Sequence, residues 1–345
     1  MTDPEKRPYL SVVVMAYRRR TFLRGAIESL DRQTLDPSEF EVIVLKDFSD
    51  PDLDAWISTL RFRSRVLTED IPGLGEMHAR GVELASGEVV CFLDDDDRFR
   101  PERLEHLRDL FVRDEKLVYV HNAYDPIDSE GQSVPTWLRK RPQASESRTV
   151  NTVPGGERSL PWIQRHGGHA NSSAMAIRAA VLRPYLPWLR KVPAGIDHSL
   201  FAIVALSGGT LLFVPDRWTD YRVHASRSHP GVRAGNEDLE LREIERLTAT
   251  GQVLGEMVAS RHDRPLAQRL VEGFCLEVAV TRYLLDPNAR FSARNRIQLL
   301  RSVRWRGEWY LLVPWVYSFY RAVLPSAAIR SYRARRMRGI QERAG

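Results

Sequence analysis

Three short apolar runs, separated by segments of helical periodicity, constrain what this chain of 345 residues can fold into. The runs are Leu10–Ala16, Glu41–Leu45 and Val89–Leu93, and each is nearly continuous in apolar, β-branched residues rather than alternating. Such runs are typical of strands that are covered on both faces. Between the first two, Thr21–Gln33 carries apolar residues at helical spacing. The alternation predicts βαβ units and an α/β fold with a mostly parallel sheet sandwiched by helices, which binds ligands at the carboxyl ends of its strands.

The remainder of the chain predicts a less regular half and then a helical region. Residues 125–168 are rich in Pro, Ser, Gly and Arg, so we expect loops there. Ile196–Leu206 predicts a helix and Thr210–Val214 a short strand. Glu237–Leu285 carries long helical patterns with few breakers. We therefore expect an α/β domain followed by a helical C-terminal region.

The net charge of +6 is unevenly distributed along the chain. Residues 290–345 contain thirteen arginines and two acids, which gives this segment +11 and leaves −5 for residues 1–289. Within it, Trp309–Ile329 is rich in Trp, Tyr, Leu and Val, but Pro and Arg interrupt it and disfavour a membrane span. Arginine and aromatic residues together favour the surface of an anionic membrane. A helical subdomain or a dimer interface is the alternative.

Four consecutive aspartates, Asp94–Asp97, follow directly on the third apolar run. Carboxylates this close repel one another and raise each other's pKa unless a cation neutralises them. Oxygen ligands suit Mg²⁺ or Mn²⁺, and Mg²⁺ commonly shares its coordination shell with substrate phosphates. The alternative is a solvated acidic turn that caps the helix beginning near Pro101.

The order of these features resembles that of the family 2 inverting glycosyltransferases, which have the GT-A fold. The resemblance is good over residues 10–125, thinner over 165–230 and not visible beyond. It implies a catalytic domain over residues 1–230, with a nucleotide-sugar half (1–125) and an acceptor half (126–230), before the helical region 231–345. The matching segments are Leu10–Tyr17, Ala26–Thr34, Phe40–Asp47, Gly75–Gly81 and Ala85–Asp97.

The resemblance implies a metal and donor site at the aspartates. Asp94 and Asp96 look like the two acids of the family's Asp-x-Asp motif, which hold Mn²⁺ or Mg²⁺ on the diphosphate of the sugar nucleotide. Asp94 and Asp95 then also contact the nucleotide sugar, and Asp97 could replace either metal ligand. His224, in the segment that often closes the catalytic domain, would approach the metal or the diphosphate. A structural histidine is the alternative there.

Three further residues would bind the nucleotide sugar if the resemblance holds: Tyr17, Asp47 and Arg80. Asp47 looks like the acid that contacts the base, and Arg80 like the arginine of the family's Ala-Arg-Asn pattern. The chain departs from the family at the end of the second strand, where Lys46 and Phe48 flank Asp47. This departure bears on which base is bound. A surface arginine on an amphipathic helix is the alternative for Arg80.

Asp197 looks like the family's catalytic base at the head of a helix. The alternative is a plain acidic residue that favours a helix N-terminus. His169, Asn171 and His198 would lie on the acceptor side.

The function expected is therefore a metal-dependent inverting transfer of a sugar from a nucleotide-diphosphate sugar to a glycan or a lipid-linked acceptor. No secretory signal is visible and only two cysteines are present, so we expect a cytoplasmic protein, peripheral at the inner membrane face through residues 290–345. Nucleic acid is not expected as a partner. The alternatives are a nucleotidyltransferase and a non-catalytic membrane- or polyanion-binding protein on the same scaffold.

Overall fold

The computed structural model describes residues 7–286 except residue 18 and the segments 135–142 and 224–236, together with six single residues between 289 and 297. Contacts divide the described chain into two units. One comprises the residues up to Val223 together with Val253–Leu270, and the other comprises residues 237–252 and those from Val271 onward. The predicted boundary at residue 230 lies outside the described residues and stays a prediction.

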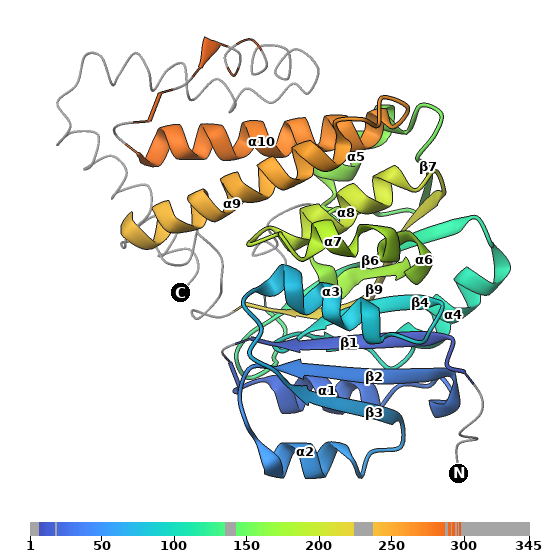
Figure 1. The fold of residues 1–345 in the computed structure, drawn as a ribbon. Helices are drawn as coiled ribbons and strands as arrows, with labels where there is room; N and C mark the ends of the chain where they lie inside the picture. Colours follow the sequence, from blue (N-terminus) through green and yellow to red (C-terminus); the bar gives the residue numbers. More distant parts are fainter. Residues whose placement is uncertain are drawn as a thin grey trace. The chain divides into compact units, whose positions relative to one another are not determined.

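The first part of the chain forms the predicted βαβ units (Figure 1). Strands β3, β2, β1 and β4 are neighbours in that order, and all are parallel. The elements are β1 (Leu10–Ala16), α1 (Leu23–Asp31), a 3-10 turn η1 (Pro37–Glu39), β2 (Phe40–Lys46), α2 (Pro51–Ile57), β3 (Arg63–Thr68), α3 (Leu74–Leu84) and β4 (Val89–Asp94).

Both faces of β1, β2 and β4 are buried, which explains their largely apolar sequences, whereas the edge strand β3 is partly exposed. On one face, Val12 and Val14 of β1 share an apolar cluster with Leu23 and Ile27 of α1 and with residues of α4. On the other face α3 lies so close to β1 that a Cβ on Gly81 would be 2.3 Å from the side chain of Val13. Helices therefore sandwich the sheet, as predicted.

The second half of the sheet is mixed rather than parallel. Strand β8 is antiparallel to both β4 and β6, β6 is parallel to β9, and β5 and β7 are antiparallel to β9. The elements are β5 (Arg98–Phe99), α4 (Arg103–Arg113), β6 (Leu117–Ile127), β7 (Arg148–Asn151), η3 (Gly156–Ser159), α5 (Leu160–Arg165), η4 (Ser172–Ala174), β8 (Met175–Arg178), α6 (Ala179–Leu182), η5 (Arg183–Tyr185), α7 (Leu186–Leu189), α8 (Ile196–Leu206) and β9 (Thr210–Arg222).

The expectation of loops over residues 125–168 is only partly right. Strand β6 continues to Ile127, and β7 and α5 interrupt the stretch. β7 has one buried residue, Val150, and forms by pairing with β9. Its pattern is too short and too exposed for periodicity to indicate a strand.

The direction of the sheet changes at β4. The strand order is β3-β2-β1-β4-β8-β6-β9-β5, with β7 also on β9, so β4 has a parallel neighbour on one side and an antiparallel one on the other. The carboxyl end of β4 therefore lies beside the carboxyl end of β1 and the amino end of β8. The strand order also reverses between β1 and β4, and open α/β sheets bind ligands outside the carboxyl ends of the strands at such a reversal.

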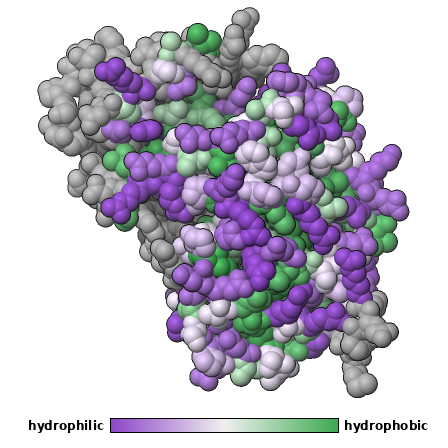
Figure 2. Space-filling view, in the orientation of Figure 1, coloured by the Kyte–Doolittle hydropathy of each residue, from purple (hydrophilic) through white to green (hydrophobic). Residues whose placement is uncertain are grey.

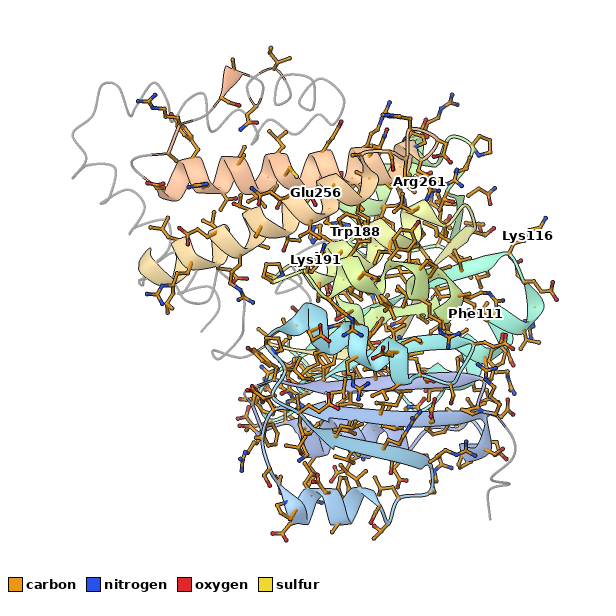
Figure 3. All side chains as sticks on the ribbon, viewed as in Figure 1. Phe111, Lys116, Trp188, Lys191, Glu256 and Arg261 are labelled. Atoms are coloured by element: carbon orange, nitrogen blue, oxygen red, sulfur yellow. The ribbon has the colours of Figure 1, made fainter. Side chains whose placement is uncertain are left out.

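The long helices predicted after residue 237 are confirmed as α9 (Glu237–Val258) and α10 (Pro265–Leu285). Just after α9, Arg261 (labelled in Figure 3) donates to the hydroxyl of Tyr185 at 3.2 Å. Among the described residues no helix is long and apolar enough to cross a membrane. Polar side chains cover most of the face shown in Figure 2, with apolar surface in patches between them. Residues 309–329 lie outside the described part of the chain, so their membrane role stays a prediction.

Candidate active site

The four aspartates form a tight turn at the carboxyl end of β4. The N–H of Asp97 donates to the carbonyl of Asp94 at 3.2 Å, and Asp95, Asp96 and Asp97 are all buried. One carboxylate oxygen from each of Asp94, Asp96 and Asp97 lies within 4.8 Å of the others. Burial, followed by the charges of Asp97, Asp96 and Asp197, raises the pKa of Asp94 well above its usual range. Burial also raises the pKa of Asp95 to about 7, against the opposing effect of Arg19.

Two arginines that the sequence interpretation missed contact this acid turn. Arg19, in the loop after β1, donates from Nε to Asp95 Oδ1 at 3.0 Å and lies 2.8 Å from Asp96 Oδ2 through Nη2. Arg222, the last residue of β9, donates its backbone N–H to Asp97 Oδ1 at 2.9 Å and its Nε–H to the carbonyl of Asp96 at 2.8 Å. Positive charge from two distant segments therefore offsets the acids.

Asp197 lies close to the acid turn because one short segment holds both. Its two carboxylate oxygens accept from the backbone N–H groups of Asn171, at 2.9 Å, and Ser172, at 3.1 Å. The hydroxyl of the next residue, Ser173, accepts the N–H of Asp94 at 3.1 Å. Residues 171–173 thus fix the second acid relative to the first, and the charge of Asp197 contributes to the raised pKa of Asp94.

The residues predicted on the acceptor side surround Asp197. Asn171 has a left-handed backbone, with φ of 67°, and its side chain accepts the N–H of Ser173 at 3.1 Å. The rings of His169 and His198 meet edge to face, with centroids 4.8 Å apart. His121 of β6 donates from Nε2 to the carbonyl of Ala170 at 2.8 Å, which anchors the same loop to the sheet.

The ends of β1 and β2 lie at the same edge of the sheet. Ala16 is in register with Lys46, so Tyr17 and Asp47, the next residues, both leave the sheet there. Lys46 is fully buried, and its ammonium pairs with Asp54 Oδ2 at 3.1 Å and donates to Thr68 Oγ1 at 2.7 Å. The positive charge of Lys46, at the end of β2, is therefore balanced by the carboxylate of Asp54.

Arg80 and His224, the other two residues predicted to bind the donor or the metal, are not seen at the acid turn among the described residues. The guanidinium of Arg80, on α3, donates to Glu69 at 3.1 and 3.2 Å and to Glu83 at 3.2 Å. These ion pairs are about one-third exposed, so a nucleotide would have to compete with two carboxylates for this side chain. His224 lies outside the described residues, and its role stays a prediction.

The donor set suits a hard divalent cation. Three carboxylates within reach of one point, with no sulfur or imidazole among them, match the ligand preference of Mg²⁺ and Mn²⁺. Burial and the neighbouring carboxylates raise the pKa of Asp94, and a bound cation would oppose this effect. The residues present therefore fit a divalent cation.

Comparison with a solved structure supports the fold, and a family model gives the family. The fold is similar to that of S. aureus TarS, residues 1–349, in a crystal structure with UDP, with a TM-score of 0.50 and 16% identity over 87% of this chain and 92% of that chain. The architecture is that of the GT-A glycosyltransferases. The sequence model of Glycosyl transferase family 2 matches residues 11–183, half of the chain. The chain belongs to this family.

The curated relatives are also glycosyltransferases by name, and they differ in how much of their own length this chain matches. An uncharacterized glycosyltransferase of Rickettsia bellii is 33% identical over 125 residues, which are 36% of this chain but 18% of that protein. The uncharacterized glycosyltransferase alr2836 of Nostoc sp. is 23% identical over 255 residues, 72% of this chain and 75% of that protein. The family assignment favours an enzyme over the non-catalytic alternative.

Proposed function

We propose that this chain is a metal-dependent inverting glycosyltransferase that moves a sugar from a nucleotide-diphosphate sugar to an acceptor. The observation that supports this most is the arrangement of its acids. A cation-binding turn at the end of β4 and a separate carboxylate at the head of α8 are held together by residues 171–173. TarS, which has a similar fold, was crystallised with UDP, and this agrees with a nucleotide donor.

We assign the donor to the edge of the sheet where β1, β2 and β4 end. Asp94 and Asp96, with Asp97, would hold Mg²⁺ or Mn²⁺, and His224 would be a further ligand. When bound, the cation supplies positive charge to the leaving diphosphate. The nucleotide sugar would contact Asp94 and also Tyr17, Asp47, Arg80 and Asp95.

The transfer itself requires one displacement at the anomeric carbon. The acceptor oxygen forms its bond to that carbon while the bond to the phosphate oxygen breaks, and the electron pair leaves with the nucleoside diphosphate. Asp197 takes the proton of an acceptor hydroxyl as the bond forms. For a phosphate acceptor, which is already ionised, Asp197 orients the oxygen instead. His169, Asn171 and His198 flank Asp197, which favours them as acceptor contacts.

A binding experiment tests the donor site. UDP-, GDP- and dTDP-linked sugars are titrated against the protein with and without Mn²⁺. One of them should bind only with the metal, and Asp96→Asn should abolish this binding. Asp109→Asn, which removes an acid from the exposed side of α4, should bind as wild type does. Metal-independent binding, or binding retained in Asp96→Asn, would contradict the metal site.

A transfer assay tests the base. Asp197→Asn should keep the donor affinity and lose transfer by about 10²- to 10⁴-fold. NMR of the product should show the anomeric configuration opposite to that of the donor. Retained configuration would overturn the inverting mechanism, and full activity of Asp197→Asn would overturn the role of Asp197 as base.

We also propose that the acceptor is lipid-linked and reached at the inner face of the cytoplasmic membrane. The support is the basic, aromatic segment 290–345, because arginine near an anionic surface contributes about 1 kcal/mol per residue. The full chain and a chain ending before residue 290 are floated with anionic liposomes. Only the full chain should float, and equal flotation would refute the membrane role.

A further inference from the structure

The guanidinium of Arg19 pairs directly with two carboxylates of the acid turn. Its guanidinium reaches Asp95 through Nε, at 3.0 Å, and through Nη2, and it lies 2.8 Å from Asp96 Oδ2. The side chain of Arg19 is 20% exposed, whereas those of Asp95 and Asp96 are 3% and 11% exposed. The Arg19 side chain is therefore more exposed than the two carboxylates that it contacts.

Asp95 and Asp96, the two acids that Arg19 contacts, differ in whether they belong to the candidate cation site. Asp96 also belongs to the group of three carboxylates that fits a divalent cation, whereas Asp95 does not. A cation bound by this group would use Asp96 and repel the guanidinium. Asp95 would remain available to Arg19, so the arginine could lose one contact without leaving the turn.

Arg19 is also well placed for a second anion. It follows β1, whose residue Met15 is in register with Asp94, so its loop leaves the sheet beside the acid turn. A guanidinium presents several N–H donors in a planar fork that matches the oxygens of a phosphate. A guanidinium that is anchored by Asp95 can exchange its contact with Asp96 for a phosphate oxygen.

We propose that Arg19 exchanges ligands during donor binding, an inference that rests on the proposed function. Without donor it neutralises Asp95 and Asp96 and competes with the divalent cation for Asp96. With cation and diphosphate bound, it keeps Asp95 and replaces Asp96 by a phosphate oxygen. Arg19 would thus weaken binding of the cation alone and strengthen binding of the diphosphate that arrives with it.

This proposal predicts opposite changes in two affinities. Mn²⁺ alone and then inorganic pyrophosphate at saturating Mn²⁺ are titrated calorimetrically; pyrophosphate tests the diphosphate site whatever base the donor carries. In Arg19→Gln the Mn²⁺ affinity should rise by about threefold, since one ion pair no longer competes. The pyrophosphate affinity should fall by about tenfold, the effect of a lost charge-assisted hydrogen bond.

Two variants make the result specific. Arg20→Gln removes the same charge from the neighbouring residue, which lies over the ring of Phe48, and should leave the pyrophosphate affinity nearly unchanged. Arg19→Lys keeps the charge and should fall between wild type and Arg19→Gln; it also serves if Arg19→Gln does not fold.

The outcomes separate this proposal from the proposed function. If wild type binds Mn²⁺ and pyrophosphate but the Arg19 variants change neither affinity, or change both in the same direction, the ligand exchange is wrong and the metal site stands. If wild type binds no Mn²⁺, both the metal-dependent function and the proposed role of Arg19 are wrong.

Discussion

Lowering the pH should loosen the loop that holds Asp197, because His121 is buried in its neutral form. His121 is 5% exposed, and its Nε2–H donates to the carbonyl of Ala170, next to the residues that bind Asp197. Burial lowers the pKa of His121 to about 4, with a smaller contribution from Arg103, whereas an unfolded histidine has its ordinary value of 6.5. Protons then bind the unfolded chain more readily than the folded one, so stability is present above pH 6.5 and is lost as the pH falls towards 4.

The size of this effect follows from the two pKa values. Between pH 7.5 and 5.5 the unfolded histidine becomes protonated while the folded one stays neutral, which costs about 1 kcal/mol of the free energy of unfolding. Urea denaturation at the two pH values measures the loss for wild type and for His121→Leu. The variant should lose about 1 kcal/mol less than wild type on acidification. Titration of the acid turn is common to both proteins and cancels in this difference.

A matched variant controls for general destabilisation. Val120→Ala removes buried apolar atoms from the same strand and no titratable group, so it should lower stability by roughly 0.5–3 kcal/mol while keeping the wild-type pH dependence. If His121→Leu and wild type lose the same free energy between pH 7.5 and 5.5, then His121 does not exclude a proton in the folded state, and the reasoning is refuted.

Three further predictions concern packing around the site. A methyl group on Gly75 would lie 2.3 Å from two backbone carbonyl oxygens, so Gly75→Ala should destabilise the fold by about 1–3 kcal/mol or more. Gly255 has open space around it, so Gly255→Ala should stabilise α9 by up to about 1 kcal/mol. Thermal denaturation that ranks the two variants the other way would contradict this packing. Lys46→Met should cost about 1–3 kcal/mol, and a double-mutant cycle with Asp54→Asn should show coupling; simple additivity would mean that the ion pair contributes nothing. Ser173→Ala removes the acceptor for the N–H that begins the acid turn, so it should weaken Mn²⁺ binding in a calorimetric titration, and unchanged affinity would count against this role.

The parallel half of the sheet could be predicted from the sequence for a simple physical reason. Strands covered on both faces must be largely apolar, and β1, β2 and β4 each carry an uninterrupted apolar run of four or five residues. The acid turn was equally visible, because four carboxylates directly after a buried strand need compensation wherever they lie. Both signals are local, so they need no knowledge of distant residues.

The compensating charges could not be predicted in the same way. Arg19 and Arg222 are 76 and 126 residues from the acids that they contact. Arg19 stands in a run of three arginines, and nothing in that run indicates that Arg19 contacts the acid turn. Arg103 is a similar case: it is fully buried and held by Asn122 and a backbone carbonyl, although its helical pattern gives it no special place. Long side chains with several rotamers are placed by tertiary contacts rather than by sequence pattern.

The change of strand direction at β4 explains why one short segment can hold both acids. If β8 were parallel to β4, its carboxyl end would lie beside the acid turn, and the residues leading into it would be at the far edge of the sheet. Because β8 is antiparallel, the chain enters it beside Asp94, and residues 171–173 pass between the turn and the head of α8. The left-handed backbone at Asn171 then aims two successive N–H groups at Asp197. The spacing between the acid turn and the separate carboxylate is thus set by hydrogen bonds in each of which one partner is a backbone N–H group, and such a bond depends on fewer side chains than a contact between two side chains.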